Sequence, residues 1–524
     1  MKLTENLSET HHAEKNTVNS TMETQLPSIP EWFRNRHVLV TGATGFMGKV
    51  LVSKLLSSCP DIGTIFLLVR EKKGVSPATR LQSIIQQVPF EALRDNHPER
   101  LKKLEVIPGD VTMDDLDLTL KNKERLLQDV SVVFHAAANV KFDTPLREAI
   151  TMNTRGVLNL IALAKQMKKL ESLVHISTAY SHCGEKVLEE RAYSCPISPE
   201  KVMTLVDILN DEILTEITPK LLHDQPNTYA FTKSLGEDLI YKSNLPAGVA
   251  RPSIVVASWK EPVPGWIENL NGPTGLMIGG AKGVIRTVHC DPDLLMDAMP
   301  CDIAINAIIA LAWRVGLEQP DKPIFMNVTE SGENPMTWSK SLELGRKHAL
   351  ANPFSGILWY PRGGITKFKY LHLVRVLFFH LLPAYFIDGM CRLTGNKPFL
   401  VRVQDKVSWG LKLVQYYTIK PWIFRNDGMK ELRQQLLPVD KEVFFMDTTA
   451  FTWDDYMKAY VLGARQYILK EDPSTLPFSR KIFMIYWIVD CIVLSSLGIL
   501  FVWFLYILIS PFLFTQKLVE VIEL

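Results

Sequence analysis

The sequence predicts an α/β protein built on a doubly wound, mostly parallel sheet, followed by a smaller, mostly helical region and a membrane-spanning helix. Three observations predict this architecture. Short apolar runs alternate with longer helical patterns up to residue 256, a glycine-rich turn follows the first run, and residues 491–510 carry no charge. Strands that alternate with helices are typical of a parallel sheet covered on both faces, as in Rossmann-type folds. With 524 residues the chain is also too long for one compact core, so we expect more than one domain.

Charge and cysteine content exclude several classes of protein. Lys and Arg number 58 and Asp and Glu number 56, a balance that gives no indication of a nucleic-acid partner. The seven cysteines are scattered and form no C-x-x-C pair, so we expect a reducing compartment and no metal site. Residues 1–30 are mostly polar and lack the apolar core of a signal peptide. We therefore expect them to be a disordered lead, and the catalytic part to face the cytosol.

Six segments have the pattern of strands. They are 37–41, 64–70, 105–111, 131–140, 170–180 and 247–256. Helical patterns separate them, for example over 146–167. Farther along, we expect a glycine-rich loop lining a site over 268–285, one amphipathic helix over 300–316, and a strand with a turn over 322–338. In such a fold, ligands bind at the carboxyl ends of the strands.

The stretch TGATGFMG places Gly42, Gly45 and Gly48 between the first strand and the helix that follows it. An ATP-type loop would need a glycine and a hydroxyl where this chain has Ala43 and Val50. A dinucleotide turn needs glycines for the tight bend, the approach of the pyrophosphate and the packing of helix on strand. We interpret the turn as a dinucleotide cradle, although its spacing departs from the usual G-x-G-x-x-G and a plain structural turn is the alternative. The other residues that would share this cradle are Thr44, Phe46 and Met47.

The end of the second strand predicts which nicotinamide cofactor binds. Folds that prefer NAD place an acid there for the ribose 2′-hydroxyl, whereas this chain has Arg70. A cation favours a 2′-phosphate and hence NADPH, and the neighbouring Glu71 is the residue that argues against this. Asp110 and Val111 follow the third strand, where we expect them to contact the adenine. The small residues that let a flat cofactor lie against the backbone after the fourth strand are Ala136 and Ala137.

The strongest catalytic pattern is Tyr229 and Lys233, which a spacing of four places on one face of a helix. A phenol has a pKa of about 10 and needs help to exchange a proton near neutral pH. A nearby ammonium stabilises the phenolate and also suits the nicotinamide ribose. Ser177 or Thr178, at the end of the fifth strand, would supply a second hydroxyl for the substrate oxygen. The pattern alone does not decide between these two.

Two apolar segments indicate contact with lipid. Between residues 482 and 514 the only formally charged side chain is Asp490, and the 20 residues from 491 to 510 have none. At about 1.5 Å per residue, 20 residues span about 30 Å, the thickness of a bilayer core. We expect water or headgroups to reach Asp490. The segment 369–390 is apolar but interrupted by charge, so we expect helices of a lipid-binding or membrane-surface domain there.

Together these features resemble the extended short-chain dehydrogenase/reductase family and, more narrowly, its alcohol-forming fatty acyl-CoA reductases. The segments that carry the resemblance are 41–70, 130–143, 226–239 and 251–275. It extends over about residues 30–470, and many insect members of that family also have a hydrophobic tail. The domains that it implies are an NADPH-binding reductase domain over 31–345, a family-specific C-terminal domain over 346–470 and a membrane-spanning segment over 482–514.

The resemblance also implies a reaction, in which a long-chain acyl-CoA and two NADPH give a primary alcohol, CoA and two NADP⁺ through an aldehyde-level intermediate. Tyr229 would donate a proton to the carbonyl oxygen, Lys233 would tune that phenol and hold the ribose, and Arg70 would meet the 2′-phosphate. Further cofactor contacts implied by the resemblance are Pro252 and Ile254. The segment 369–390 is expected to shape the tunnel for the acyl chain.

Two other functions are compatible with these residues. A membrane-bound hydroxysteroid or sterol dehydrogenase would use the same Tyr and Lys, but with NAD⁺ and a ring alcohol. A non-catalytic dinucleotide sensor or scaffold at a membrane would need the glycine turn without the Tyr and Lys. For the reductase, the expected partners are acyl-CoA and membrane lipid. The expected location is the endoplasmic reticulum membrane, with the peroxisomal membrane as the alternative.

Overall fold

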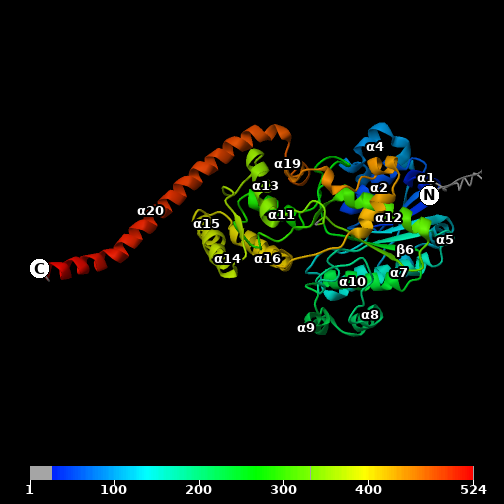
Figure 1. Ribbon diagram of the computed structural model, residues 1–524, viewed down its shortest axis with the longest axis horizontal. Coiled ribbons are helices and arrows are strands. Elements are labelled where there is room, and N and C mark those ends of the chain that lie inside the picture. The colour runs from blue at the N-terminus through cyan, green and yellow to red at the C-terminus, as the bar shows by residue number, and fades with distance from the viewer. Residues whose placement is uncertain (1–25, 331, 523–524) are drawn as a thin grey trace, which may run out of the picture.

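A computed structural model describes residues 26–330 and 332–522, and its central element is a parallel sheet of seven strands (Figure 1). The strand order is β10-β6-β5-β4-β1-β2-β3. The strands are β1 (His37–Thr41), β2 (Ile65–Val69), β3 (Leu104–Pro108), β4 (Val130–His135), β5 (Ser172–Ile176), β6 (Ala247–Pro252) and β10 (Ile324–Val328). Every neighbouring pair runs parallel. This confirms the predicted fold class, and it places the switch point of the chain between β1 and β4.

Helices cover both faces of the sheet, as a doubly wound fold requires (Figure 1). Alternate side chains of β1 belong to different cores: Val38 and Val40 pack on one face and Leu39 packs on the other. The first core includes residues of α2 (Phe46–Ser58), α3 (Pro77–Ile85) and α12 (Cys301–Glu318). The second includes residues of α5 (Leu120–Asp129), α7 (Gly156–Ala164) and α10 (Thr228–Tyr241). The remaining helices of this part are α1 (Ile29–Phe33), α4 (Glu91–Asn96), α6 (Leu146–Ile150), α8 (Pro199–Ile208) and α9 (Asp211–Leu221).

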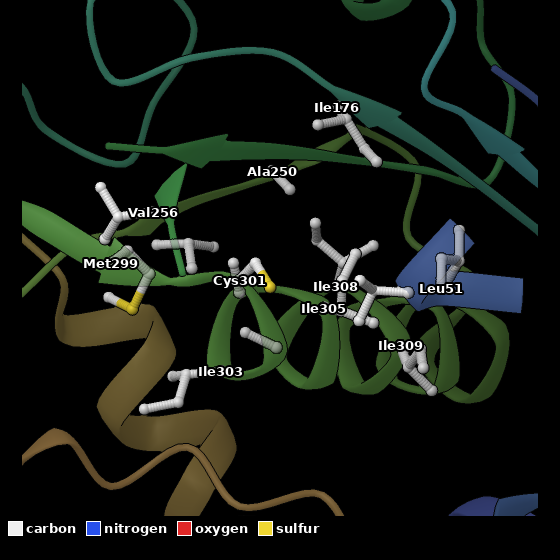
Figure 2. Packing of buried hydrophobic residues seen from close by; sticks show 14 of the residues in the cluster. Leu51, Ile176, Ala250, Val256, Met299, Cys301, Ile303, Ile305, Ile308 and Ile309 are labelled. Atoms are coloured by element: carbon white, nitrogen blue, oxygen red, sulfur yellow. The ribbon is translucent and has the colours of Figure 1, made fainter. Parts of the chain in front are cut away.

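Helix α12 differs from the amphipathic helix expected over 300–316. From Cys301 to Val315 every residue except Arg314 is buried (Figure 2). One side of α12 packs on β5 and β6, and α1, α2 and the later helix α17 (Asp427–Gln435) lie against it as well. A helix enclosed in this way needs no polar face, so its burial could not be deduced from its periodicity.

The glycine-rich loop expected over 268–285 is largely a helix, α11 (Pro273–Ala281). Pro273 stands at its first position, where the missing N–H costs nothing. The strand predicted over 247–256 is also divided. A separate strand β7 (Ile254–Val256) follows β6 and pairs with β9 (Ala298–Pro300). A second short pair joins β8 (Thr287–His289) to β11 (Gly364–Thr366).

A mostly helical region follows the sheet. Its helices are α13 (Trp338–Ala351), α14 (Lys369–Val376), α15 (Leu382–Leu393), α16 (Leu400–Thr418), α17, α18 (Pro438–Val443) and α19 (Trp453–Gly463). The first core continues into residues of α13, α17 and α19, so this region shares a core with the sheet. In contrast, α14 and α15 expose large apolar side chains, among them Tyr370 and Phe386.

The chain ends in helix α20 (Leu476–Ile522), which extends away from the rest of the molecule (Figure 1). Among the described residues, two helical segments are long and apolar enough to cross a membrane, namely 473–511 with a mean hydropathy of 2.6 and 369–393 with 1.5. Helices α14 and α15 lie at the end of the body toward which α20 extends (Figure 1). These features indicate association with a membrane. At the other end, the lead expected over 1–30 lies outside the described residues up to 25, whereas Ile29 is a buried residue of α1.

Asp490 in α20 is buried rather than open to water or headgroups. Its side chain is 1% exposed and forms an ion pair with Arg362. Trp359 donates its indole N–H to Asp490 Oδ1 over 2.5 Å, and Arg286 Nη2 lies 4.0 Å from the same oxygen. Arg286 and Arg362 belong to loops of the body that sequence periodicity does not connect to α20. The carboxylate is therefore shielded by the protein itself and fixes α20 to the body.

We expect Asp490→Ala to destabilise the protein, because Arg362 loses its ion-pair partner, Trp359 loses its acceptor and the largely buried Arg286 loses the nearby opposite charge. Breaking a buried pair by removing one charge costs about 3–5 kcal/mol. The measurement is the thermal unfolding midpoint of the full chain in detergent. The paired replacement of Asp490 by Leu and Arg286 by Met should recover part of the loss, because the half-exposed Arg362 can be hydrated. If it unfolds as early as the single variant, the buried charge of Arg286 is not what destabilises Asp490→Ala.

Candidate functional site

A large cleft opens at the carboxyl ends of the strands, beside the switch point, and contains about 1680 Å³ of empty space. Its wall includes twelve of the residues that the sequence predicted for the site. They are Gly42, Gly45, Phe46, Met47, Gly48, Ala136, Ser177, Thr178, Tyr229, Lys233, Pro252 and Ile254. Tyr417 and Thr418 of α16 close the cleft from the helical region. A pocket at this position of a doubly wound sheet is the expected place for a dinucleotide.

The protein constrains the three glycines of the turn to different degrees. Gly42 has a φ of +75°, and a Cβ there would lie 2.5 Å from the backbone of Ala136 on the neighbouring strand end. A Cβ on Gly48 would lie 2.3 Å from Gly42 O, so the third glycine lets α2 pack against the turn. Gly45 is less constrained by the protein, with 3.3 Å to the nearest atom, and is the N-cap of α2. No side chain caps α2, so the positive end of this helix faces the cleft and suits a pyrophosphate.

Helix α10 brings Tyr229 and Lys233 to the other side of the cleft. Asn227 caps this helix by accepting a hydrogen bond from the Ala230 N–H over 2.9 Å. Lys233 is buried and donates from Nζ to the carbonyl oxygen of Ile176 over 2.7 Å, at the end of β5. This contact holds the first residues of α10 against the strand end that carries Thr178.

The electrostatics of the pair differ from the sequence-based expectation. Burial raises the pKa of Tyr229 to about 12, and a hydrogen bond with the Thr178 hydroxyl opposes this rise. Burial lowers the pKa of Lys233 to about 8, against the opposing charge of Glu237. In the protein alone, therefore, the group that favours the phenolate is Thr178 rather than Lys233. Tyr229 is a protonated acid near neutral pH, which is the form needed to donate to a developing oxyanion.

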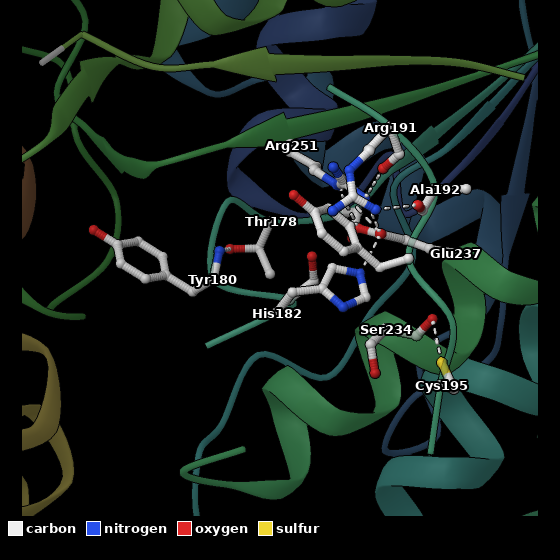
Figure 3. Close-up of polar contacts among 12 residues, drawn as sticks. Thr178, Tyr180, His182, Arg191, Ala192, Cys195, Ser234, Glu237 and Arg251 are labelled. Atoms are coloured by element: carbon white, nitrogen blue, oxygen red, sulfur yellow. Dashed lines mark hydrogen bonds and ion pairs between the residues drawn. The ribbon is translucent and has the colours of Figure 1, made fainter. Parts of the chain in front are cut away.

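Ser177 and Thr178 have different roles in the structure. Ser177 donates from Oγ to Glu237 Oε1 over 2.5 Å, so its hydroxyl is engaged in the buried interior. Glu237 lies one turn after Lys233 on α10 and also binds His182 Nε2 at 2.9 Å and Arg251 Nη2 at 2.6 Å (Figure 3). Although burial would raise the pKa of Glu237, the charges of Arg251 and then His182 hold it well below its usual range. The geometry therefore favours Thr178 as the hydroxyl for the substrate.

The residues predicted for the adenosine end do not line the cleft. Arg70 is half exposed and pairs with Asp110 at 3.2 Å, where β2 and β3 end. Arg80, on α3, donates to Arg70 O over 2.6 Å and to the Thr44 hydroxyl over 3.1 Å. Thus Arg80 is hydrogen-bonded to Thr44 and Arg70, and Arg70 in turn pairs with Asp110, beside the glycine turn. Two other predicted residues are placed elsewhere: Val111 is buried in a core and packs against Gly156, and Ala137 is bound through its N–H to Thr41.

Sequence reasoning missed Arg80. Its position on the first turn of the helix after β2, close to the glycine turn in a parallel sheet, is the signal that would have indicated it. Burial and the charge of Arg70 lower the pKa of Arg80, as expected for two guanidinium groups that share one region. A nearby anion would relieve that repulsion.

Cys183 lies near the cleft in sequence but is a structural residue. It is buried, and burial raises the pKa of its thiol to about 12. A thiol with such a pKa is not a nucleophile at neutral pH. The chemistry of the site therefore centres on hydroxyl groups.

The arrangement of sheet, turn and Tyr–Lys helix is that of the extended short-chain dehydrogenase/reductase class. Two family models match the chain, an NAD-binding model over residues 40–308 and a second model, named Sterile, over 379–471. Both are described as male sterility protein.

Relatives over most of the chain narrow the class. The chain is 38% identical over 460 residues to fatty acyl-CoA reductase 1 of Gallus gallus, covering 87% of this chain and 88% of that one. It is 36% identical to the Homo sapiens protein of the same name over the same shares, and 35% identical to fatty acyl-CoA reductase 2 of Mus musculus, covering 86% and 88%. The chain belongs to the fatty acyl-CoA reductase family.

Solved structures share the fold at low identity. The terminal R domain of the myxalamid PKS-NRPS pathway aligns with a TM-score of 0.56 and 17% identity, covering 82% of this chain and 90% of that one. The reductase domain of a nonribosomal peptide synthetase from Mycobacterium tuberculosis aligns with a TM-score of 0.55 and 18% identity, covering 85% and 94%. At this identity the likeness establishes the fold.

We expect Thr178→Ala to reduce kcat much more than Ser177→Ala. Losing a hydrogen-bond donor to a developing oxyanion costs about 10²- to 10³-fold in kcat. Ser177→Ala removes one of several contacts of Glu237 and leaves the cleft chemically unchanged. The measurement is steady-state NADPH oxidation by each variant, with circular dichroism to establish that both are folded. Equal losses would contradict the separate roles assigned to these hydroxyls.

Proposed function

We propose that this protein reduces long-chain fatty acyl-CoA to the primary fatty alcohol with two equivalents of NADPH. The observation that carries the proposal is the meeting of Tyr229, Thr178 and Lys233 in one cleft with the glycine turn, in a chain of this family. Its overall balance is acyl-CoA, two NADPH and two protons giving the alcohol, CoA and two NADP⁺. The relatives' names support the substrate class.

The cleft fits a nicotinamide dinucleotide. The uncapped N-terminus of α2 and the low steric constraint at Gly45 suit its pyrophosphate, and the bound cofactor would supply a hydride to the substrate carbon. Phe46, Met47, Ala136, Pro252 and Ile254 belong to the same wall. Lys233 donates one hydrogen bond to Ile176 O, and its ammonium has further N–H groups that can reach a ribose hydroxyl.

The protein's own groups act on the oxygen of the thioester. Tyr229 donates its proton to that oxygen, while the Thr178 hydroxyl holds it in line. Negative charge grows on the oxygen as the carbon is reduced, and two positioned donors in a buried site stabilise that charge. The hemithioacetal then returns its hydroxyl proton to the Tyr229 phenolate as it releases CoA as a thiolate and leaves an aldehyde. Tyr229, protonated again, and Thr178 serve the aldehyde oxygen in the second reduction, after which water reprotonates the phenolate and the CoA thiolate.

The exposed apolar helices support a lipid substrate. Burying an acyl chain gains about 0.8 kcal/mol per CH₂, so long-chain substrates and products partition into bilayers. The exposed apolar faces of α14 and α15 and the helix α20 would hold the enzyme where both accumulate. We propose a catalytic body over 31–345 and a C-terminal domain over 346–470 on the cytosolic side. The membrane-spanning segment over 482–514 would anchor them in the endoplasmic reticulum membrane, with the peroxisomal membrane as the alternative.

We expect Tyr229→Phe to lose turnover of palmitoyl-CoA by about 10²-fold or more while it still binds NADPH, because only the proton donor is removed. Mass spectrometry should identify hexadecanol as the product of the unmodified enzyme. The matched control is Tyr241→Phe, at the exposed end of the same helix. NADPH oxidation with palmitoyl-CoA is compared with NAD⁺ reduction by a hydroxysteroid. Turnover of the steroid alone, or full activity of Tyr229→Phe, would refute the proposal.

We expect replacement of Arg70 and Arg80 by Ala to weaken NADPH binding much more than NADH binding. Each hydrogen bond to a charged phosphate contributes about 1.5–3 kcal/mol, so losing both should lower the preference for NADPH by about 100-fold or more. Lys72→Ala removes a charge from the same loop and is the control. Dissociation constants from fluorescence titration give the result. An unchanged ratio of the dissociation constants for NADPH and NADH would show that these guanidinium groups do not bind the 2′-phosphate.

A further inference from the structure

A second cavity lies beside the catalytic cleft and contains about 1080 Å³ of empty space. It is enclosed by α11, α13, α19 and the segment 361–365. The two spaces share four wall residues, so they are neighbours. These are Pro273, Leu276, Trp338 and Thr418. A ligand bound at Tyr229 therefore has this cavity next to it.

The cavity suits an apolar occupant. Met277, Ile285, Met296 and Met457 are among its lining residues. The hydroxyls of its two tyrosines are already engaged, since Tyr456 donates to Ala257 O over 2.6 Å and Tyr460 bonds Thr274 Oγ1 at 2.6 Å. A polar ligand would find few free partners in this wall, whereas flexible methionines adapt to an alkyl chain.

Two of the helices that line the cavity contribute glycines to its wall. Gly280 of α11 and Gly345 of α13 line it, and a Cβ added to either would meet no atom within 4 Å. Neither has the positive φ that makes glycine necessary. Glycine inside a helix costs about 0.5–1 kcal/mol relative to Ala. Gly345 is buried, and its backbone conformation does not require glycine. The missing side chain leaves empty space in the cavity at this position.

Each glycine lies the same number of residues after a residue shared with the cleft. Helix α11 begins at the shared residue Pro273 and α13 at the shared residue Trp338, and each glycine follows seven residues later. With a rise of about 1.5 Å per residue, seven residues span about 10 Å along each helix. Ala349, which also lines the cavity, lies one turn farther along α13.

We propose that this cavity is the chamber for the acyl chain, and that Gly280 and Gly345 set the chain length it admits. The inference rests on the function proposed above and names its specificity-determining residues. It also replaces the expectation that 369–390 shapes the tunnel, because none of those residues lines the cavity. A long chain passes between the two glycines, whereas a short chain ends before reaching them.

The test is Gly345→Phe in the full chain, assayed with octanoyl-, dodecanoyl-, palmitoyl- and stearoyl-CoA. One surplus methylene in a pocket changes kcat/KM by about 10- to 200-fold, so palmitoyl- and stearoyl-CoA should lose at least about tenfold. Octanoyl-CoA should be little changed. The matched control is Gly410→Phe, at an exposed helical glycine of α16 that also has open space around its Cα. An unchanged chain-length profile in folded Gly345→Phe overturns the chamber, whereas a wild-type enzyme that reduces no acyl-CoA refutes the proposed function instead.

A second measurement uses the wild-type enzyme and so does not depend on how a variant folds. Palmitoyl-CoA carrying a diazirine at its terminal carbon is photolysed on the protein in detergent, and the labelled peptides are identified by mass spectrometry. Labelling should fall within the segments that line the cavity, among them 273–281, 338–351, 361–365 and 453–460, and be suppressed by unmodified palmitoyl-CoA. Suppressible labelling confined to segments that do not line the cavity, such as 369–393, overturns the proposal.

Discussion

The buried carboxylate of Glu237 is the contact on which the geometry of the cleft depends. It joins three elements: its own helix α10, the strand β6 through Arg251, and the segment after β5 through Ser177 and His182. Arg251 is fully buried, so neither charge is solvated by water. Taking such a pair out of water is costly, and it is tolerated because several hydrogen bonds satisfy both groups. These contacts of Glu237 also hold α10, which carries Tyr229, against the segment after β5, which carries Thr178.

The surroundings of this contact keep further charge away from it. His135 and His175 stack beneath the cleft with ring centroids 5.2 Å apart, and both are fully buried. Burial, and then the charge of Lys233, holds the pKa of each well below its usual range, so both rings are neutral. Lys233 and Glu237 lie one turn apart on α10 and have different partners. The ammonium binds Ile176 O at the wall of the cleft, whereas the carboxylate binds Arg251 and His182 in the interior.

Local patterns predicted much of this structure. The strands and the glycine turn were recognisable because strand burial and turn geometry are encoded in neighbouring residues, and the Tyr–Lys spacing is a property of a single helix. The features that were missed depend on contacts between distant segments. Helix α12 is buried by elements far from it in sequence, from α1 to α17. Asp490 finds its partners more than 100 residues earlier, and Arg80 meets Thr44 only after two strands align. The open space at Gly345 exists only once α11 and α13 face each other, so no periodicity in either helix indicates it.

The burial of Asp490 has a consequence for how the molecule sits in a bilayer. A single apolar helix in lipid can spin about its axis and slide along the membrane normal at little cost. Here Arg362, Arg286 and Trp359 hold one point of α20 from the side, which removes both freedoms at once. Arg362 lies within the segment 361–365 that walls the apolar cavity. Because Asp490 joins that segment to α20, the wall of the cavity keeps a fixed position relative to the helix that is apolar enough to enter the bilayer.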